Sequence, residues 1–134
     1  MFFQNALALL GPPGRLTDAT PEAQRRTLQW IAEEVVPQGG SDPRVAIEKA
    51  LSLGPQVIFL LSENITGFGQ FELDKRALLA FIQRKNPVGK PHHTRINCIQ
   101  FLDTDPIDTL QEIARIHGGP DGFRLLKRAE LGLD

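Results

Sequence analysis

The sequence predicts an α/β fold with a mostly parallel sheet, and three observations carry this prediction. Segments with helical spacing of apolar residues alternate with short runs rich in β-branched and aromatic residues. Three of the helical segments start with a polar residue followed by proline, which is a helix-start signal. Strands that alternate with helices are usually parallel and joined by right-handed crossovers. With 134 residues, the chain is expected to form one domain, in which a tract and turn over 1–19 precede an α/β core over 20–134.

The first predicted helix covers residues 21 to about 35. The hydroxyl of Thr20 can cap its N-terminus, Pro21 suits the first helical position, and Glu22 places a negative charge at the positive end of the helix dipole. Apolar residues follow this start at helical spacing. We expect them to face the core: Leu28, Ile31, Ala32 and Val35.

An aspartate followed by proline marks two further helix starts, and both aspartates are explained as helix caps. The helix opened by Asp42 should run to about Leu53, with four inward residues: Ala46, Ile47, Ala50 and Leu51. The helix opened by Asp105 should run to His117, with four more: Ile107, Leu110, Ile113 and Ala114.

Three strands and one more helix complete the predicted elements. The run Val57-Ile58-Phe59-Leu60-Leu61 is continuously apolar, which is typical of a strand covered on both faces. Residues 95–101 form a second strand because β-branched and aromatic residues dominate them, and a short third strand over 123–126 follows a glycine turn. The additional helix should cover about 70–85, with inward residues Phe71, Leu78, Phe81 and Ile82.

Charge and cysteine content exclude several classes of protein. Fifteen basic and sixteen acidic residues leave a formal charge of −1 without a basic stripe, so we expect neither a nucleic acid partner nor an anionic membrane. The apolar start is short and lacks a basic region, so neither a signal peptide nor a membrane span is expected. Cys98 is the only cysteine and cannot form an internal disulfide, which favours a reducing, cytoplasmic location.

Polar residues follow the two main predicted strands, where the functional crevice of an open α/β sheet lies. The first group is Ser62-Glu63-Asn64 and the second is Asp103-Thr104-Asp105. A loop with Ser41, just before a predicted helix, could approach the same edge. Together these segments offer hydroxyl and carboxylate oxygens, which are the ligands that magnesium and calcium prefer.

Several other conspicuous residues are expected to have structural roles. The pair His92-His93 should lie in a solvated loop, and Cys98 should pack in the core. His117 should end a helix, where a positive charge suits the helix dipole. Trp30 is expected to anchor a helix to the sheet.

Five motifs occur in an order that resembles a known family. They read ATPE at 19–22, GGSDP at 39–43, VIFLLSEN at 57–64, RINCI at 95–99 and IARIHGG at 113–119. This series is similar to the later two-thirds of a von Willebrand factor type A domain, closest to a bacterial branch that reads ATPEN, GGTDP, IFLLTDG and INTI. The resemblance covers nearly the whole chain. It implies a three-layer, Rossmann-like α/β fold that lacks the first central strand and its helix, because Phe2-Phe3 matches a later edge strand.

The resemblance also implies the position of a divalent cation site. In the family an Asp-x-Ser-x-Ser motif, a threonine and an aspartate hold the ion. Ser41 matches the threonine and Glu63 matches the aspartate, while Ser62 and Asn64 replace its neighbours. The extra methylene of glutamate moves the carboxylate by about 1.5 Å. Since no Asp-x-Ser-x-Ser occurs, we expect no tightly bound Mg²⁺ and no other cofactor.

The resemblance therefore implies a non-catalytic protein-interaction domain that contacts its partner through Ser62, Asn64, Asp103 and Asp105 or through an open sheet edge. The run 57–61 would pair with the missing strand, so something should cover it: the N-terminal tract Phe2 to Leu10 folded back, a second copy of the chain, or a protein partner that adds a strand. We favour a homodimer. One alternative is a small enzyme that uses Glu63, Asp103 and Asp105 on a small substrate or a metal-bound water. A further alternative is a remnant of a longer gene.

Overall fold

The computed structural model describes residues 1–3, 7–11, 14–36, 42–63, 65, 74–102 and 104–133. The chain divides into two compact units, Met1–Leu53 and Gly54–Asp134. No helix in the described residues is both long enough and apolar enough to span a membrane.

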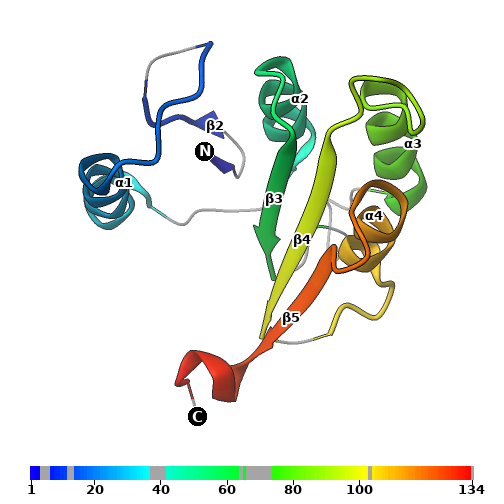
Figure 1. The fold of residues 1–134 in the computed structure, drawn as a ribbon. Helices are drawn as coiled ribbons and strands as arrows, with labels where there is room; N and C mark the ends of the chain where they lie inside the picture. Colours follow the sequence, from blue (N-terminus) through cyan, green and yellow to red (C-terminus); the bar gives the residue numbers. More distant parts are fainter. Residues whose placement is uncertain are drawn as a thin grey trace. The chain divides into compact units, whose positions relative to one another are not determined.

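The unit Met1–Leu53 contains a short hairpin and two helices (Figure 1). Strands β1 (Phe2–Phe3) and β2 (Leu7–Ala8) pair antiparallel. They are followed by helices α1 (Pro21–Glu34) and α2 (Arg44–Ser52). The hairpin was not among the predicted elements, because two-residue strands leave no recognisable alternation in the sequence.

Helix α1 begins as predicted but does not bury its apolar side. The Thr20 hydroxyl accepts a hydrogen bond from the Ala23 backbone N–H at 3.1 Å, which confirms the cap. No residue of α1 is buried, and Leu28 and Ile31 are 68% and 50% exposed. The prediction that this stripe faces a core is therefore wrong. Helical spacing determines which side of a helix is apolar, but it does not supply a surface to cover that side.

Helix α2 begins one residue later than Pro43, the predicted first position. The carboxylate of Asp42 accepts the Arg44 backbone N–H at 3.0 Å and forms an ion pair with the Arg44 guanidinium at 2.6 Å. The hydrogen bonds from this guanidinium lower the pKa of Asp42. Ala46 and Ile47 are buried, as predicted.

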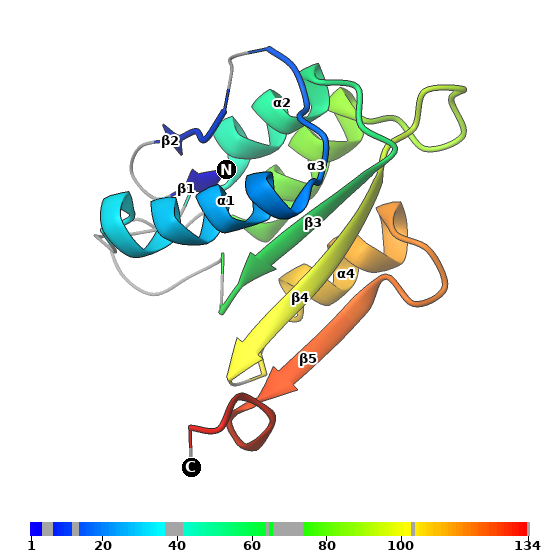
Figure 2. The same ribbon diagram turned by 60° about the vertical axis from the view of Figure 1, so that its left-hand side comes forward.

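The unit Gly54–Asp134 contains a sheet of three strands, all parallel (Figure 2). The strands β3 (Val57–Ser62), β4 (Arg95–Leu102) and β5 (Phe123–Lys127) lie in that order. Val57 pairs with Arg95, and Cys98 pairs with Phe123. Helices alternate with these strands, so the predicted α/β fold with a parallel sheet is confirmed at this level.

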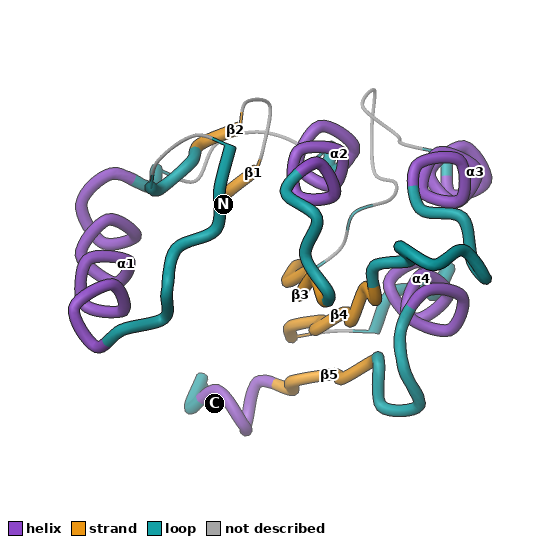
Figure 3. Tube along the Cα trace, turned by 45° about the horizontal axis from the view of Figure 1, so that its top comes forward, coloured by secondary structure: helices purple, strands orange, loops and turns teal. Residues whose placement is uncertain are grey.

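Two helices lie on the same side of this sheet (Figure 3). These are α3 (Lys75–Lys85) and α4 (Thr109–His117), and α4 packs against β4 and β5. A short helix η1 (Arg128–Leu131) follows β5. The core of this unit consists of buried residues from both helices, from the strands and from the segment after β3: Leu60, Ile65, Leu78, Ile82, Ile96, Cys98, Leu110, Ile113 and Ala114.

The helix starts in this unit differ from the predicted ones. The Asp74 carboxylate accepts the Arg76 backbone N–H at 2.9 Å and caps α3, while the predicted start near residue 70 and Phe71 lie outside the described residues. Helix α4 begins at Thr109, three residues after the predicted position. Ile107 therefore lies in a turn and is 46% exposed, not inward as predicted.

A buried polar network joins the end of α3 to the start of β4. The Asn86 side chain donates to the Thr94 carbonyl at 2.7 Å and accepts the Thr94 backbone N–H at 2.9 Å. The Thr94 hydroxyl donates to the Pro55 carbonyl at 2.8 Å, just before β3. Because each of these polar groups has a hydrogen-bond partner, the network holds the loop 87–94 against the sheet without the free-energy penalty of an unpaired buried group.

Helix α4 meets the sheet at a glycine. A Cβ atom at Gly118 would lie 2.5 Å from the Ala114 carbonyl oxygen and 3.0 Å from the Ile96 carbonyl oxygen. Both neighbours are backbone atoms and cannot move aside independently. Gly118 therefore permits the close approach of α4 to β4.

The side of the sheet away from α4 carries exposed apolar side chains on β3. Successive strand residues point to opposite faces, so Leu60 points to the helix side and is buried, while Phe59 and Leu61 point to the other side. Phe59 and Leu61 are 61% and 48% exposed. The expectation that β3 is covered on both faces is therefore wrong.

Candidate functional site

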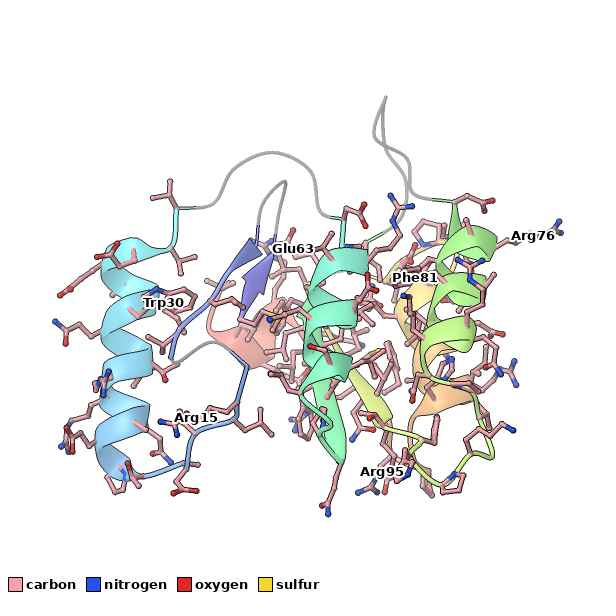
Figure 4. All side chains as sticks on the ribbon, turned by 90° about the horizontal axis from the view of Figure 1, so that it is seen from above. Arg15, Trp30, Glu63, Arg76, Phe81 and Arg95 are labelled. Atoms are coloured by element: carbon pink, nitrogen blue, oxygen red, sulfur yellow. The ribbon has the colours of Figure 1, made fainter. Side chains whose placement is uncertain are left out.

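The carboxyl end of the sheet holds the residues that the sequence singled out. Ser62 ends β3 and is half-buried, and Glu63 follows it and is exposed. Figure 4 shows Glu63 and Arg95 at opposite ends of the sheet. The predicted site residues Ser41, Asn64 and Asp103 lie outside the described residues.

Asp105 is buried and both of its carboxylate oxygens accept backbone hydrogen bonds. Its Oδ1 accepts the Ile107 N–H and its Oδ2 accepts the Thr109 N–H, both at 3.0 Å. Asp105 therefore holds the turn before α4, which agrees with a capping role although the helix starts later than predicted. Asp108 completes the turn with a left-handed backbone, φ 51°.

The described residues do not fit a divalent cation well. Glu63 is exposed, and the oxygens of Asp105 are directed at backbone N–H groups. Within the described ranges, no three His, Cys, Asp or Glu side chains lie close enough together to hold a metal ion. A carboxylate that already accepts two backbone N–H groups has less capacity to bind a cation, so we derive no metal chemistry at this edge.

Two histidines form a contact that the sequence patterns do not predict. The rings of His93 and His117 stack with centroids 5.6 Å apart, and His93 Nε2 lies 3.3 Å from His117 Nδ1. His117 is fully buried, and no described group is hydrogen-bonded to its Nε2. A sequence signal existed, because His117 follows Ile113 by four residues and so shares the buried side of α4.

Burial, and to a smaller extent the charge of the neighbouring His93, lower the pKa of His117 to about 4. The imidazole is therefore neutral at pH 7. This corrects the expectation that a positive His117 complements the helix dipole, because desolvation outweighs the attraction of the helix end.

Cys98 lies in the core on the helix side of β4, as predicted. Burial raises the pKa of its thiol to about 12. A thiol with so high a pKa is almost never a thiolate at neutral pH, so Cys98 is a packing residue and not a nucleophile.

The outer side of β3 is the remaining candidate surface. Within the described part of the chain, β3 pairs only with β4, so its other edge has no strand partner. Phe59 and Leu61 stand exposed beside this edge. We call this combination of unpaired edge and exposed side chains the open β3 surface. Trp30 on α1 is half-buried, and its role as an anchor between helix and sheet stays a prediction.

No family model matches the chain. No curated protein and no solved structure matches it either. The resemblance to von Willebrand factor type A domains thus rests on the five sequence motifs alone.

Proposed function

We propose that the chain is a non-catalytic protein-interaction domain of the von Willebrand factor A type, and that it binds its partner through the open β3 surface. The order of the five motifs and the alternation of helices with parallel strands support this proposal. In a von Willebrand factor A fold, the outer edge of β3 is where the first central strand would pair.

The single observation that carries the proposal is the exposure of Phe59 and Leu61 beside an edge strand. An apolar edge strand presents unpaired N–H and C=O groups that can accept another strand. Each large apolar side chain contributes about 1.5 to 3 kcal/mol when it is buried. A partner that covers this surface would therefore gain both backbone hydrogen bonds and apolar contact.

A second copy of the chain is the partner that we favour. Two copies related by a two-fold axis can pair β3 with β3 in the antiparallel sense, which makes one continuous sheet of six strands. Strand addition from another protein is the alternative partner for the same edge.

The loop residues at the carboxyl end of the sheet add a second contact region to the proposal. Ser62, Asn64 and Asp103 stay candidate contact residues. Asp105 contributes by holding the shape of its loop, because both its oxygens are engaged. Because both Asp105 oxygens already accept backbone hydrogen bonds, this arrangement does not support an enzyme in which Asp105 acts as an acid or base.

We further propose that the chain alone does not hold Mg²⁺ tightly. The family resemblance assigns only Ser41 and Glu63 to the cation, and one hydroxyl with one carboxylate is a small part of the six oxygen ligands that magnesium requires. Calorimetric titration with magnesium, calcium and manganese should show no saturable heat. Binding in the micromolar range would contradict this part of the proposal.

Sedimentation velocity tests the interaction surface. At about 200 µM we expect a dimer and at about 2 µM a growing share of monomer, because association follows mass action. The double variant Phe59→Lys with Leu61→Lys should remain monomeric at both concentrations, since like charges opposed across paired strands repel. The variant Val88→Lys is the control, because Val88 is 49% exposed in the loop between α3 and β4 and is not part of the β3 strand.

Amide hydrogen exchange locates the contact within the dimer. In β3 the backbone N–H groups that do not face β4 should exchange fast in the monomer and slowly in the dimer. A well-folded monomer at both concentrations would contradict the homodimer. A dimer with unchanged exchange of these amides would contradict the use of the β3 edge.

A further inference from the structure

The open side of the sheet extends beyond β3. The register places Phe59 beside Asn97 and Leu61 beside Ile99, and it places Ile99 beside Arg124. Paired residues of parallel strands share a face, so one surface crosses all three strands. We call it the open sheet face, and its members are Val57, Phe59, Leu61, Arg95, Asn97, Ile99, Phe101, Arg124 and Leu126.

The apolar members of this face form a band. Phe59 and Leu61 are exposed, and Ile99, Phe101 and Leu126 are half-buried. Neither α3 nor α4 covers them, because both helices lie on the other side of the sheet (Figure 3). In proteins, sheets made only of parallel strands almost always have helices on both faces. A helix about 10 Å wide spans two strands that are about 4.8 Å apart, so one helix suffices for the band on β3 and β4.

The charged members of this face have one sign. Arg95 and Arg124 are both exposed, and the face carries no carboxylate among its members. Within the described residues Arg95 forms no ion pair, and Arg124 has only a long contact of 3.9 Å to Glu130, with 69% of its side chain exposed. Both cations therefore remain available to a carboxylate from a partner.

From the apolar band and its two exposed cations we infer that the open sheet face binds an amphipathic α-helix of a partner protein, with carboxylates along the flank of that helix. The apolar side of the helix covers Phe59, Leu61 and Ile99, and the carboxylates pair with Arg95 and Arg124. This inference rests on the proposed interaction function and names the kind of partner. It concerns the whole open sheet face, whereas a second copy or an added strand uses the edge of β3 together with Phe59 and Leu61 beside it.

Binding of designed peptides to the full chain tests the inference. Three helical peptides of about 18 residues share one leucine-rich side, long enough at 1.5 Å per residue to cover a strand. Their flanks carry glutamate, glutamine or lysine. Fluorescence anisotropy should show the glutamate peptide binding at least about ten times more tightly than the lysine peptide, with the glutamine peptide between them, and the difference should shrink with added salt.

Variants assign the site. The double variant Arg95→Glu with Arg124→Glu should reverse the order, so that the lysine peptide binds most tightly. The matched control is Arg76→Glu with Arg84→Glu, because both side chains are exposed on α3, on the opposite side of the sheet. This control should keep the original order. Phe59→Asp should weaken all three peptides by about tenfold or more, with circular dichroism confirming that each variant is folded.

The possible results separate the inference from the proposed function. Equal binding of the glutamate and lysine peptides, or an unchanged order in the Arg95 and Arg124 variant, would overturn the inference. If no peptide binds while sedimentation shows a dimer through the β3 edge, the acidic helix is wrong and the interaction function stands. If no peptide binds and the chain is also monomeric, both fail.

Discussion

Acid should destabilise the unit Gly54–Asp134 through His117. This side chain is fully buried against His93, and its pKa is about 4, compared with 6.5 for an unperturbed histidine. Between these two values the unfolded chain holds a proton that the folded chain does not. The contribution of His117 to the free energy of unfolding should therefore be complete above about pH 6.5 and should fall as the pH decreases toward 4.

The size of the effect follows from the difference in pKa. The pKa of His117 is 6.5 when unperturbed and about 4 in the folded chain. Since one pKa unit corresponds to about 1.4 kcal/mol, this difference sets an upper limit of about 3 kcal/mol on the loss of stability. Because the neighbouring His93 is only half-buried, solvent screening reduces this upper limit, and we expect a loss of about 1 to 2 kcal/mol between about pH 7.5 and pH 5. Asp42 and Glu112 also have lowered pKa values, but their unperturbed values of 3.8 and 4.5 lie below this interval, so they contribute little within it.

Urea denaturation followed by circular dichroism at several pH values measures this loss. In the variant His117→Leu the free energy of unfolding should be nearly independent of pH over the same interval, since the titrating ring is absent. The variant His92→Leu is the control, because His92 is exposed in the adjacent loop, and it should keep the full dependence.

Two results would refute this reasoning. One is a pH dependence of the His117→Leu variant as steep as that of the unmodified chain. The other is an NMR titration of the His117 ring with a pKa near 6.5, which also provides a test if the leucine variant does not fold.

Three further outcomes are expected. Replacing Asp105 by alanine should lower the free energy of unfolding by about 1 to 3 kcal/mol, because two backbone N–H groups lose their acceptor, and asparagine should recover part of it in the same urea experiment. Cys98 should react with an aromatic disulfide reagent at pH 8 only at the rate of unfolding, and fast reaction in the absence of urea would show an accessible thiol. Replacing Gly118 by alanine should cost about 2 to 4 kcal/mol, because its Cβ would meet the Ala114 carbonyl at 2.5 Å, and an unchanged melting temperature would contradict this close approach.

The sequence predicted the type and order of the main elements because their signals are local. Apolar spacing identified α4, and β-branched runs identified β3 and β4 to within two residues. The exact start of α4 was not predictable from the same kind of signal. Asp105 followed by proline suits a helix cap, but it equally suits the turn that the structure contains.

Burial of the apolar surfaces could not be predicted from local patterns. Leu28 and Leu110 both lie on apolar helix sides, yet Leu110 is buried against the sheet and Leu28 is exposed. What distinguishes them is the tertiary partner, which the spacing of residues does not reveal. The same limit explains why the sequence indicated His117 as a helix end but not as a buried contact of His93.

The candidate site was predicted only in part. The carboxyl end of the sheet was the expected location, and Asp105 lies there with a capping role. The open sheet face was not foreseen, because its members come from three strands and become neighbours only through the register of β3, β4 and β5. Arg95 and Arg124 are far apart in the sequence, so no motif links them.

Every strand pair in the parallel sheet joins segments separated by a helix, since Val57 meets Arg95 and Cys98 meets Phe123. No hairpin is available in this sheet to start its pairing early. The intervening helix must fold back before the first hydrogen bond between two strands can form. The entropy of loop closure is therefore lost before any strand pairing stabilises the chain. Folding of this unit should therefore be slower than that of a helical bundle of equal size, and its apolar strands remain exposed during that delay.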